Sequence, residues 1–259
     1  MTDLLHARID GPADAPPVVL LGSLGSTSEM WEPNVPALAA RHRVVRLDNL
    51  GHGGSPVPEG PYSIAGMAES ALATLDSLGL QRVAWVGLSL GGMIGMYLGS
   101  EHPERVSALA LCCTTACFED KTPWRQRIAD VRARGTGAIA EPVVSRWFVG
   151  EWATRHPDVV RRAEGWLAGT ADAGYLGCCQ AIEAWDHRAR LSAVRPPTLV
   201  IGGADDQATP VDQHARVLAE RIPGARLEVV PGGHVASWQS AEQVNALLLS
   251  LLDGPSAAR

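Results

Sequence analysis

A serine placed between glycines is the first group in this sequence that could do chemistry. Residues 86–92 read VGLSLGG, so Ser89 stands two residues after Gly87 and two before Gly91. With an apolar run on each side, this pattern indicates a tight turn from strand to helix, where a Cβ at either glycine would clash. Such a turn would expose the hydroxyl as a nucleophile and direct the N–H of Leu90 at a developing oxyanion. The alternative is an ordinary glycine-rich turn, since the bare motif is common.

The sequence also offers partners that a serine nucleophile requires, because a free hydroxyl is a weak nucleophile. His234 follows an apolar run in the stretch PGGHVASW, and two carboxylates follow the preceding run in GGADDQATP. Both stretches would leave the carboxyl ends of strands, at the same edge as Ser89, and the chain order serine, acid, histidine is a known one. The spacing within GADDQATP favours Asp206 over Asp205 as the acid that orients His234 and stabilises its cation.

A second oxyanion donor is expected from the loop GSLGSTSEMW, residues 22–31, which follows an earlier apolar run. Alignment with the usual pattern of such loops assigns this role to the N–H of Leu24. Taken alone, the loop is better explained as an ordinary Gly/Ser loop. A further Gly-rich loop, DNLGHGGS at residues 48–55, is expected to shape the site, with His52 as a structural residue rather than a second base.

Alternating strands and helices would have to position these groups. The expected strands are short, nearly continuous apolar runs, which suit central parallel strands buried on both faces. Helical periodicity fills most of the intervals between them, so the prediction is a doubly wound, mostly parallel α/β sheet. The strands are expected at 17–22, 42–48, 82–87, 108–113, 197–203 and 226–232, with an edge strand at 4–11. The helices are expected at 64–80, 92–106, 212–222 and 240–252.

One interval breaks the alternation. From about residue 116 to 195 the patterns are helical, with no convincing strand, and five of the eight tryptophans lie there. We therefore predict an α/β core formed by 1–116 and 196–259, with an inserted helical cap at 117–195. Trp124 and Trp147 are the candidates for walls of a substrate pocket enclosed by this cap. The alternative for each of them is packing in the core of the cap.

Composition excludes several classes of function. The 259 residues carry a net charge of −6 with scattered Lys and Arg, which argues against a nucleic-acid groove. No apolar run approaches a membrane span, and the first residues lack a signal-peptide pattern, so a cytoplasmic protein is expected. The five cysteines include two vicinal pairs and are expected to be free thiols. No Cys and His spacing fits a metal site, and no cofactor is expected.

These motifs resemble those of the α/β-hydrolase superfamily along nearly the whole chain, and they are most similar to the 3-oxoadipate enol-lactonases. The motifs that carry the resemblance are SLGS, MWEPNVPALA, GHGGSPVPEGPYSI, GLSLGGMIGMYL, TPWRQRIADVRARG, RWF, GYLGCCQAI and GADDQATP. The ones in the cap are the more specific. Two positions depart from the family: Gly22 replaces the usual Asn of the oxyanion loop, and Leu50 replaces a common Arg.

The resemblance implies hydrolysis of a small enol-lactone that bears a carboxylate, through an acyl-enzyme on Ser89 and without a cofactor. Such a carboxylate would bind an Arg, but the cluster at Arg125, Arg127, Arg132 and Arg134 spans several helix faces and singles out none. Alternatives on the same scaffold are a carboxylesterase, another lactonase, a carbon–carbon bond hydrolase, a perhydrolase, or a ligand receptor with slow turnover. Dehalogenases and epoxide hydrolases need an Asp in place of Ser89. Homo-oligomerisation stays open.

Overall fold

A seven-stranded sheet organises the molecule, in a computed structural model that describes residues 3–254. The strand order is β1-β3-β2-β4-β5-β6-β7, and all neighbours are parallel except β1 and β3. The chain thus winds outward from β2 and β4 in both directions, and the predicted α/β class is confirmed. The strands are β1 (Ala7–Asp10), β2 (Pro17–Leu21), β3 (Arg43–Leu47), β4 (Val83–Leu88), β5 (Val106–Cys112), β6 (Thr198–Gly203) and β7 (Arg226–Val230).

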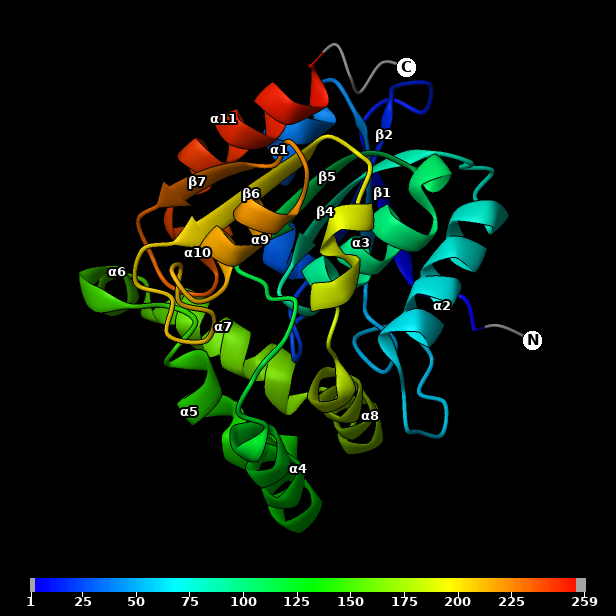
Figure 1. Ribbon diagram of the computed structural model, residues 1–259. Helices are drawn as coiled ribbons and strands as arrows, with labels where there is room; N and C mark the ends of the chain where they lie inside the picture. The colour runs from blue at the N-terminus through cyan, green and yellow to red at the C-terminus, as the bar shows by residue number, and fades with distance from the viewer. Residues whose placement is uncertain (1–2, 255–259) are drawn as a thin grey trace.

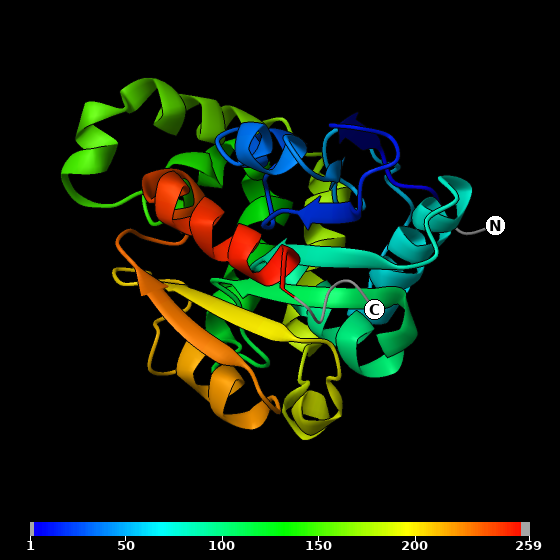
Figure 2. The same cartoon turned by 90° about the horizontal axis from the view of Figure 1, so that it is seen from above.

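Helices cover both faces of this sheet (Figures 1 and 2). One face carries α1 and α11, which contact each other, and the other face carries α2, α3 and α9. Apolar residues on both sides of the sheet make its central strands a continuous core. The bounds of these helices are α1 (Val35–Ala39), α2 (Ile64–Ser77), α3 (Leu90–Glu101), α9 (Ala215–Arg221) and α11 (Ala241–Leu252), and the short α10 (Ala236–Gln239) follows β7.

The continuous apolar runs occur where the sheet is buried, as expected. Every residue of β4 and β6 is buried. The prediction was wrong for β7, whose run reads like a central strand. This strand forms the edge of the sheet, and Val229 is 47% exposed.

The helical interval lies between β5 and β6. Its helices gather on one side of the core, below the sheet in Figure 1. Apart from an isolated bridge between Cys117 and Asp186, no strand forms in it, as predicted. The exact division at residues 117 and 195 stays a prediction. The helices are α4 (Thr122–Arg134), α5 (Ala140–Val144), α6 (Gly150–Arg155), α7 (Pro157–Ala168) and α8 (Asp172–Ala184).

An ion cluster joins α7 of the cap to the core. Arg162 lies 2.9 Å from a carboxylate oxygen of Glu29 and 2.6 Å from one of Glu32. Trp166 Nε1 donates to the same Glu29 oxygen at 3.0 Å. The hydrogen bond from Arg162 is the main reason that the pKa of Glu29 lies below its ordinary value. The cluster is partly exposed, so it holds the cap in place with modest energy.

Candidate active site

The turn that carries Ser89 is as tight as the glycine spacing predicted. Ser89 has φ 54° and ψ −112°, a conformation that a residue with a Cβ rarely adopts. A Cβ on Gly87 would lie 2.1 Å from the carbonyl oxygen of Gly91, and one on Gly91 would lie 2.1 Å from that of Leu21. Neither glycine can therefore be replaced without moving the backbone.

Hydrogen bonds of the backbone hold this strained serine in place. The N–H of Ser89 donates to Cys112 O at 2.9 Å, and its carbonyl accepts from Met93 N at 3.0 Å and from Thr114 Oγ1 at 2.7 Å. Its side-chain hydroxyl has no hydrogen-bond partner among residues 3–254 and lines a cavity. Strain of this kind persists only where the surroundings over-determine it, which is typical of functional sites.

The structure brings His234 and Asp206 together at the same edge of the sheet. His234 Nδ1 lies 2.9 Å from Asp206 Oδ2 and 3.2 Å from Oδ1, and both side chains are buried. The carboxylate also accepts from Thr209 Oγ1 at 2.6 Å and from the N–H of Ala208 at 2.8 Å. Asp205 is exposed and lies outside this network.

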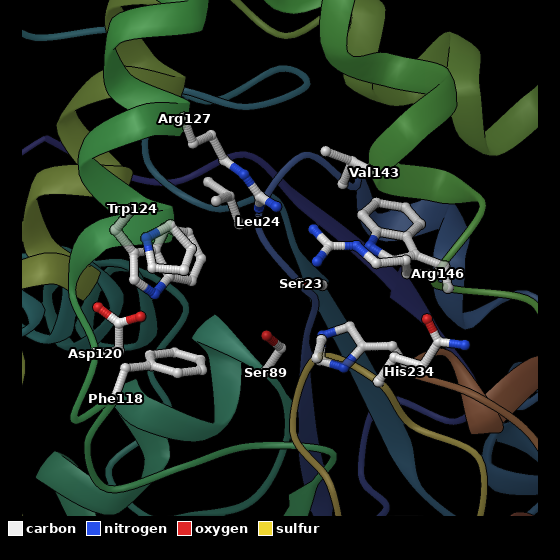
Figure 3. Close-up of a pocket in the computed structure, with 14 residues that line it drawn as sticks. Ser23, Leu24, Ser89, Phe118, Asp120, Trp124, Arg127, Val143, Arg146 and His234 are labelled. Carbon is white, nitrogen blue, oxygen red and sulfur yellow. The ribbon is translucent and has the colours of Figure 1, made fainter.

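This network fixes the charge of the acid and the orientation of the ring. Burial alone would raise the pKa of Asp206, but the attraction of His234 and the hydrogen bonds from His234 and Thr209 hold that pKa well below its ordinary value. The ionised carboxylate accepts the Nδ1 proton of His234, so in the neutral ring Nε2 carries the lone pair. His234 and Ser89 line the same cavity, and Figure 3 shows the ring beside the hydroxyl.

Two backbone N–H groups are available near Ser89. Those of Leu24 and Leu90 donate in no hydrogen bond formed among residues 3–254, and Ser23 and Leu24 line the cavity with the serine. Leu90 opens helix α3, whose N-terminus favours negative charge. Both groups are thus free to bind an oxyanion, the role the sequence suggested for them.

His52 holds the loop that contains Leu24. Gly25 N donates to His52 Nε2 at 2.8 Å, and His52 Nδ1 lies 3.1 Å from Leu50 O, so Nδ1 carries the proton. Burial lowers the pKa of His52 to about 4, which keeps the ring neutral. The geometry therefore supports the structural role expected for His52.

The two departures from the enol-lactonase pattern have structural counterparts. A Cβ on Gly22 would lie 2.3 Å from Met30 Sδ, because this sulfur fills the space and accepts from Ser23 N at 3.2 Å. Leu50 is buried, and its carbonyl accepts from Cys178 Sγ of the cap at 3.4 Å. Both positions thus pack tightly without the usual polar side chains.

The cavity over Ser89 has a volume of about 200 Å³ and lies between the core and the cap (Figure 3). Trp124, from α4, and Trp147, which follows α5, both line it, as expected of pocket walls. The remaining lining residues are Ser23, Leu24, Phe118, Asp120, Pro123, Arg127, Val143, Arg146, Gln207, Ala208 and His234.

Two arginines of this cavity were missed as functional residues by sequence reasoning. Arg127 and Arg146 extend from the cap toward its centre (Figure 3), and neither forms an ion pair with a carboxylate of the described chain. Burial, and next the charge of Arg127, lower the pKa of Arg146. Asp120 is the one acidic lining residue, and its carboxylate accepts from Thr122 N at 2.8 Å. The RWF motif and the arginine cluster could have drawn attention to these two residues. Neither pattern shows which side chains point into the cavity.

The cysteines do not offer a competing nucleophile. All five are free thiols, as expected. Burial raises the pKa of each one, to about 12 for Cys112 and Cys179, so the thiolate is disfavoured. No three His, Cys, Asp or Glu side chains among residues 3–254 are grouped to hold a metal ion. No helix in this range has the length and apolar composition needed to cross a membrane.

Fold and site together define a class of protein. The family model of the alpha/beta hydrolase fold matches residues 16–241. The chain therefore belongs to the α/β-hydrolase family, and the prediction of a hydrolase is confirmed.

Within this family, the chain is similar to enol-lactonases and to a RutD protein. 3-Oxoadipate enol-lactonase 2 of Acinetobacter baylyi is 32% identical over 235 residues, which cover 91% of this chain and 88% of that protein. The crystal structure of the enol-lactonase from Burkholderia xenovorans LB400 superposes with a TM-score of 0.94 at 36% identity and covers 96% of both chains. The predicted likeness to enol-lactonases is thus confirmed. A RutD protein of Klebsiella pneumoniae, named provisionally as a carbamate hydrolase, is 36% identical over 258 residues. The matched region covers 94% of this chain and 92% of the RutD protein.

Proposed function

We propose that this protein opens a small lactone that bears a carboxylate, of the 3-oxoadipate enol-lactone type, through an acyl-enzyme on Ser89. The observation that carries the substrate class is the pair Arg127 and Arg146 in the cavity over Ser89. Neither guanidinium group has a carboxylate partner in the described chain, and Arg127 lies over the Trp124 ring at 4.9 Å. A substrate carboxylate could therefore pair with both. The volume of about 200 Å³ suits a single small ring.

In the proposed reaction, His234 Nε2 takes the proton of Ser89 as Oγ attacks the ring carbonyl. Asp206, held by Thr209 and Ala208, keeps Nδ1 protonated and stabilises the imidazolium. The N–H groups of Leu24 and Leu90 would bind the oxyanion, an effect of roughly 3–4 kcal/mol per donor.

Collapse of the tetrahedral intermediate opens the ring, and His234 gives its proton to the leaving enol oxygen. The leaving group stays attached through the acyl chain, because the ester is cyclic. A water molecule, deprotonated by the same Nε2, then attacks the acyl-enzyme and regenerates Ser89. The released enol becomes a ketone, which draws the reaction toward the product. No step requires a metal or an organic cofactor.

The test compares three substrates: an enol-lactone with a carboxymethyl group, its methyl ester, and a carbamate of similar size. We expect kcat/KM for the charged lactone to exceed that for its neutral ester by about tenfold or more, since charge-assisted hydrogen bonds contribute about 1.5–3 kcal/mol. Equal values for the first two would contradict the role of the arginines. Preference for the carbamate would favour the activity named for the RutD relative.

A further inference from the structure

A second cavity lies directly behind the wall of the first. Its volume is about 620 Å³, more than that of the cavity over Ser89, and it falls in the range typical of ligand sites. The two cavities share five lining residues, from the start of the cap and from the acid loop: Phe118, Asp120, Pro123, Gln207 and Ala208. These residues are therefore the partition between the two spaces.

Phe118 is the largest side chain of this partition. Its ring packs against Trp124 on one side, with centroids 5.3 Å apart, and against His214 on the other, with centroids 5.6 Å apart. Trp124 lines only the first of these two cavities, and His214 only the second. In Figure 3 the Phe118 ring lies beside Ser89. The aromatic ring thus separates the nucleophile from the larger space.

The His214 ring, which packs on Phe118, is itself held in place by a hydrogen bond. Thr115 Oγ1 donates to Cys117 O at 2.7 Å, so it accepts the proton of His214 Nδ1, which lies 2.7 Å away. Thr115 is buried, and His214 is half-buried. A histidine ring fixed in this way supports the Phe118 ring from behind.

Part of the lining beyond Phe118 is apolar, and it includes Ala116, Pro210, Val217 and Leu218. The charged side chains Glu119 and Arg221, both exposed, also line this cavity. Arg188 also lines this cavity, but it is already paired with Asp186 at 2.6 Å and with Glu119 at 3.2 Å.

We propose that Phe118 sets the length limit of the substrate, by closing the catalytic cavity against this second cavity, which would accept an apolar acyl chain. The inference rests on the proposed function of Ser89 but not on the identity of the lactone. Removal of the ring would join the two spaces next to the nucleophile. The acyl chain of a longer ester would then extend from the acyl carbonyl carbon bound to Ser89 Oγ, through the space that the ring had filled, toward Val217.

The test is the acyl-chain profile of Phe118→Ala on p-nitrophenyl esters, from acetate to octanoate. We expect kcat/KM for the octanoate to rise by about tenfold or more relative to the acetate, because each methylene placed in an apolar pocket strengthens binding. Phe118→Leu should give a smaller shift in the same direction. A profile that changes equally at all lengths, or that falls for octanoate, would overturn the proposal.

Two further variants separate this route from a general loosening of the site. Val143→Ala enlarges the catalytic cavity at a residue that does not line the second one, and it should not select for octanoate. Val217→Phe fills the second cavity from α9, so it should remove the octanoate gain from Phe118→Ala. Octanoate selection by Val143→Ala, or persistence of the gain with Val217→Phe, would contradict a chain path through the second cavity.

A binding measurement keeps this proposal separate from the proposed lactonase activity. Calorimetric titration with butanoate and octanoate, in a Ser89→Ala background, needs no turnover. We expect Phe118→Ala to tighten octanoate binding about tenfold and to leave butanoate binding unchanged. If lactones fail as substrates but this pattern holds, only the proposed function is lost. If lactones are hydrolysed but octanoate binding is unchanged, only the role of Phe118 is lost.

Discussion

The sheet edge and the cap hold their functional groups in different ways. At the sheet edge, Asp206 and His234 are buried and hydrogen-bonded to each other, and Ser89 is fixed by its own backbone. In the cap, Arg127 and Arg146 extend into the cavity without a carboxylate partner. The acid and the histidine are already paired without substrate, whereas the cap presents arginines that a substrate carboxylate would pair.

This difference separates reaction type from substrate choice. In the proposed mechanism, the backbone at the sheet edge determines where the nucleophile, the base and the acid lie, so the chemistry would depend on few residues. Side chains on separate cap helices set the charge and size of the cavity, which allows the substrate to change while the chemistry stays the same. Variants of the two regions should accordingly alter different kinetic constants.

The largest effect is expected from the sheet edge. Ser89→Ala should lower kcat by about 10⁴-fold or more, because it removes the hydroxyl that is proposed to attack the substrate. Ser89→Gly should be as inactive but more stable than Ser89→Ala by about 1 kcal/mol, because glycine adopts φ 54° without strain. Steady-state kinetics and chemical denaturation would measure both. Retention of near-normal turnover by either variant would contradict the serine mechanism.

Loss of the acid should come next. Asp206→Asn is expected to lower kcat by about 10³–10⁴-fold with a small change in KM, since an amide no longer enforces the Nδ1 proton of His234. Asp205→Asn is the matched control, because that neighbour is exposed and outside the network. Asp206→Asn should have a much lower kcat than Asp205→Asn, whereas the melting temperatures of the two variants should be similar. Equal losses would mean that the acid was assigned wrongly.

A pH effect on stability should arise in both regions. Burial lowers the pKa of His52 in the core, and that of His187 at the end of the cap, to about 4. The unfolded chain binds a proton near pH 6.5, so each histidine adds stability above that pH and loses it as the pH falls toward 4, by up to about 3 kcal/mol.

Replacement of either histidine by Gln should remove its share of this pH dependence, as measured by urea titrations at pH 7.5 and 4.5. His52→Gln should also lower kcat, because His52 holds the loop of Leu24, whereas His187→Gln should leave kcat unchanged. Unfolding free energies that keep the wild-type pH slope in both variants would refute these assignments.

The cap arginines should change binding rather than chemistry. Arg127→Gln and Arg146→Gln are each expected to raise KM for a carboxylate-bearing lactone by about 10–100-fold, with kcat for p-nitrophenyl acetate nearly unchanged. Arg125→Gln is the control on the same helix, since Arg125 is exposed and paired with Glu183 at 2.7 Å. A similar KM for all three variants would argue against a carboxylate site.

The smallest effect is expected where the cap meets the core. Arg162→Met removes the ion pairs to Glu29 and Glu32, and should lower the free energy of unfolding by less than about 1 kcal/mol, because the pairs are partly exposed and screened. Arg155→Met, within the cap, is the comparison, since the ion pair of Arg155 within residues 3–254 is with exposed Glu151. A loss of several kcal/mol for Arg162→Met alone would show that the cluster, and not apolar packing, attaches the cap.

The sequence predicted the sheet edge better than the cap for a physical reason. Ser89, Asp206 and His234 each follow an apolar run that had to be a strand, and parallel strands end at one edge. The glycines around Ser89 further require one particular turn. Chain order and backbone sterics were thus sufficient to bring these side chains together.

The cap could not be derived in this way. Whether Arg127 faces the cavity depends on how α4 packs on α8, and Arg146 follows the end of α5, where no helical period applies. The exposure of β7 likewise depends on the absence of a neighbour beyond it in the sheet, which its residues do not encode. These features depend on tertiary packing, which cannot be predicted well from a single sequence.

The most direct test of the central claim is to label the nucleophile covalently. An activated aryl phosphonate should add one phosphonyl group per chain, and peptide mass spectrometry should place that group on Ser89. Asp206→Asn should slow the labelling, and Ser89→Ala should abolish it. Labelling of another residue, or an unlabelled Ser89 in an enzyme that has lost its activity, would contradict the serine at the sheet edge as the nucleophile.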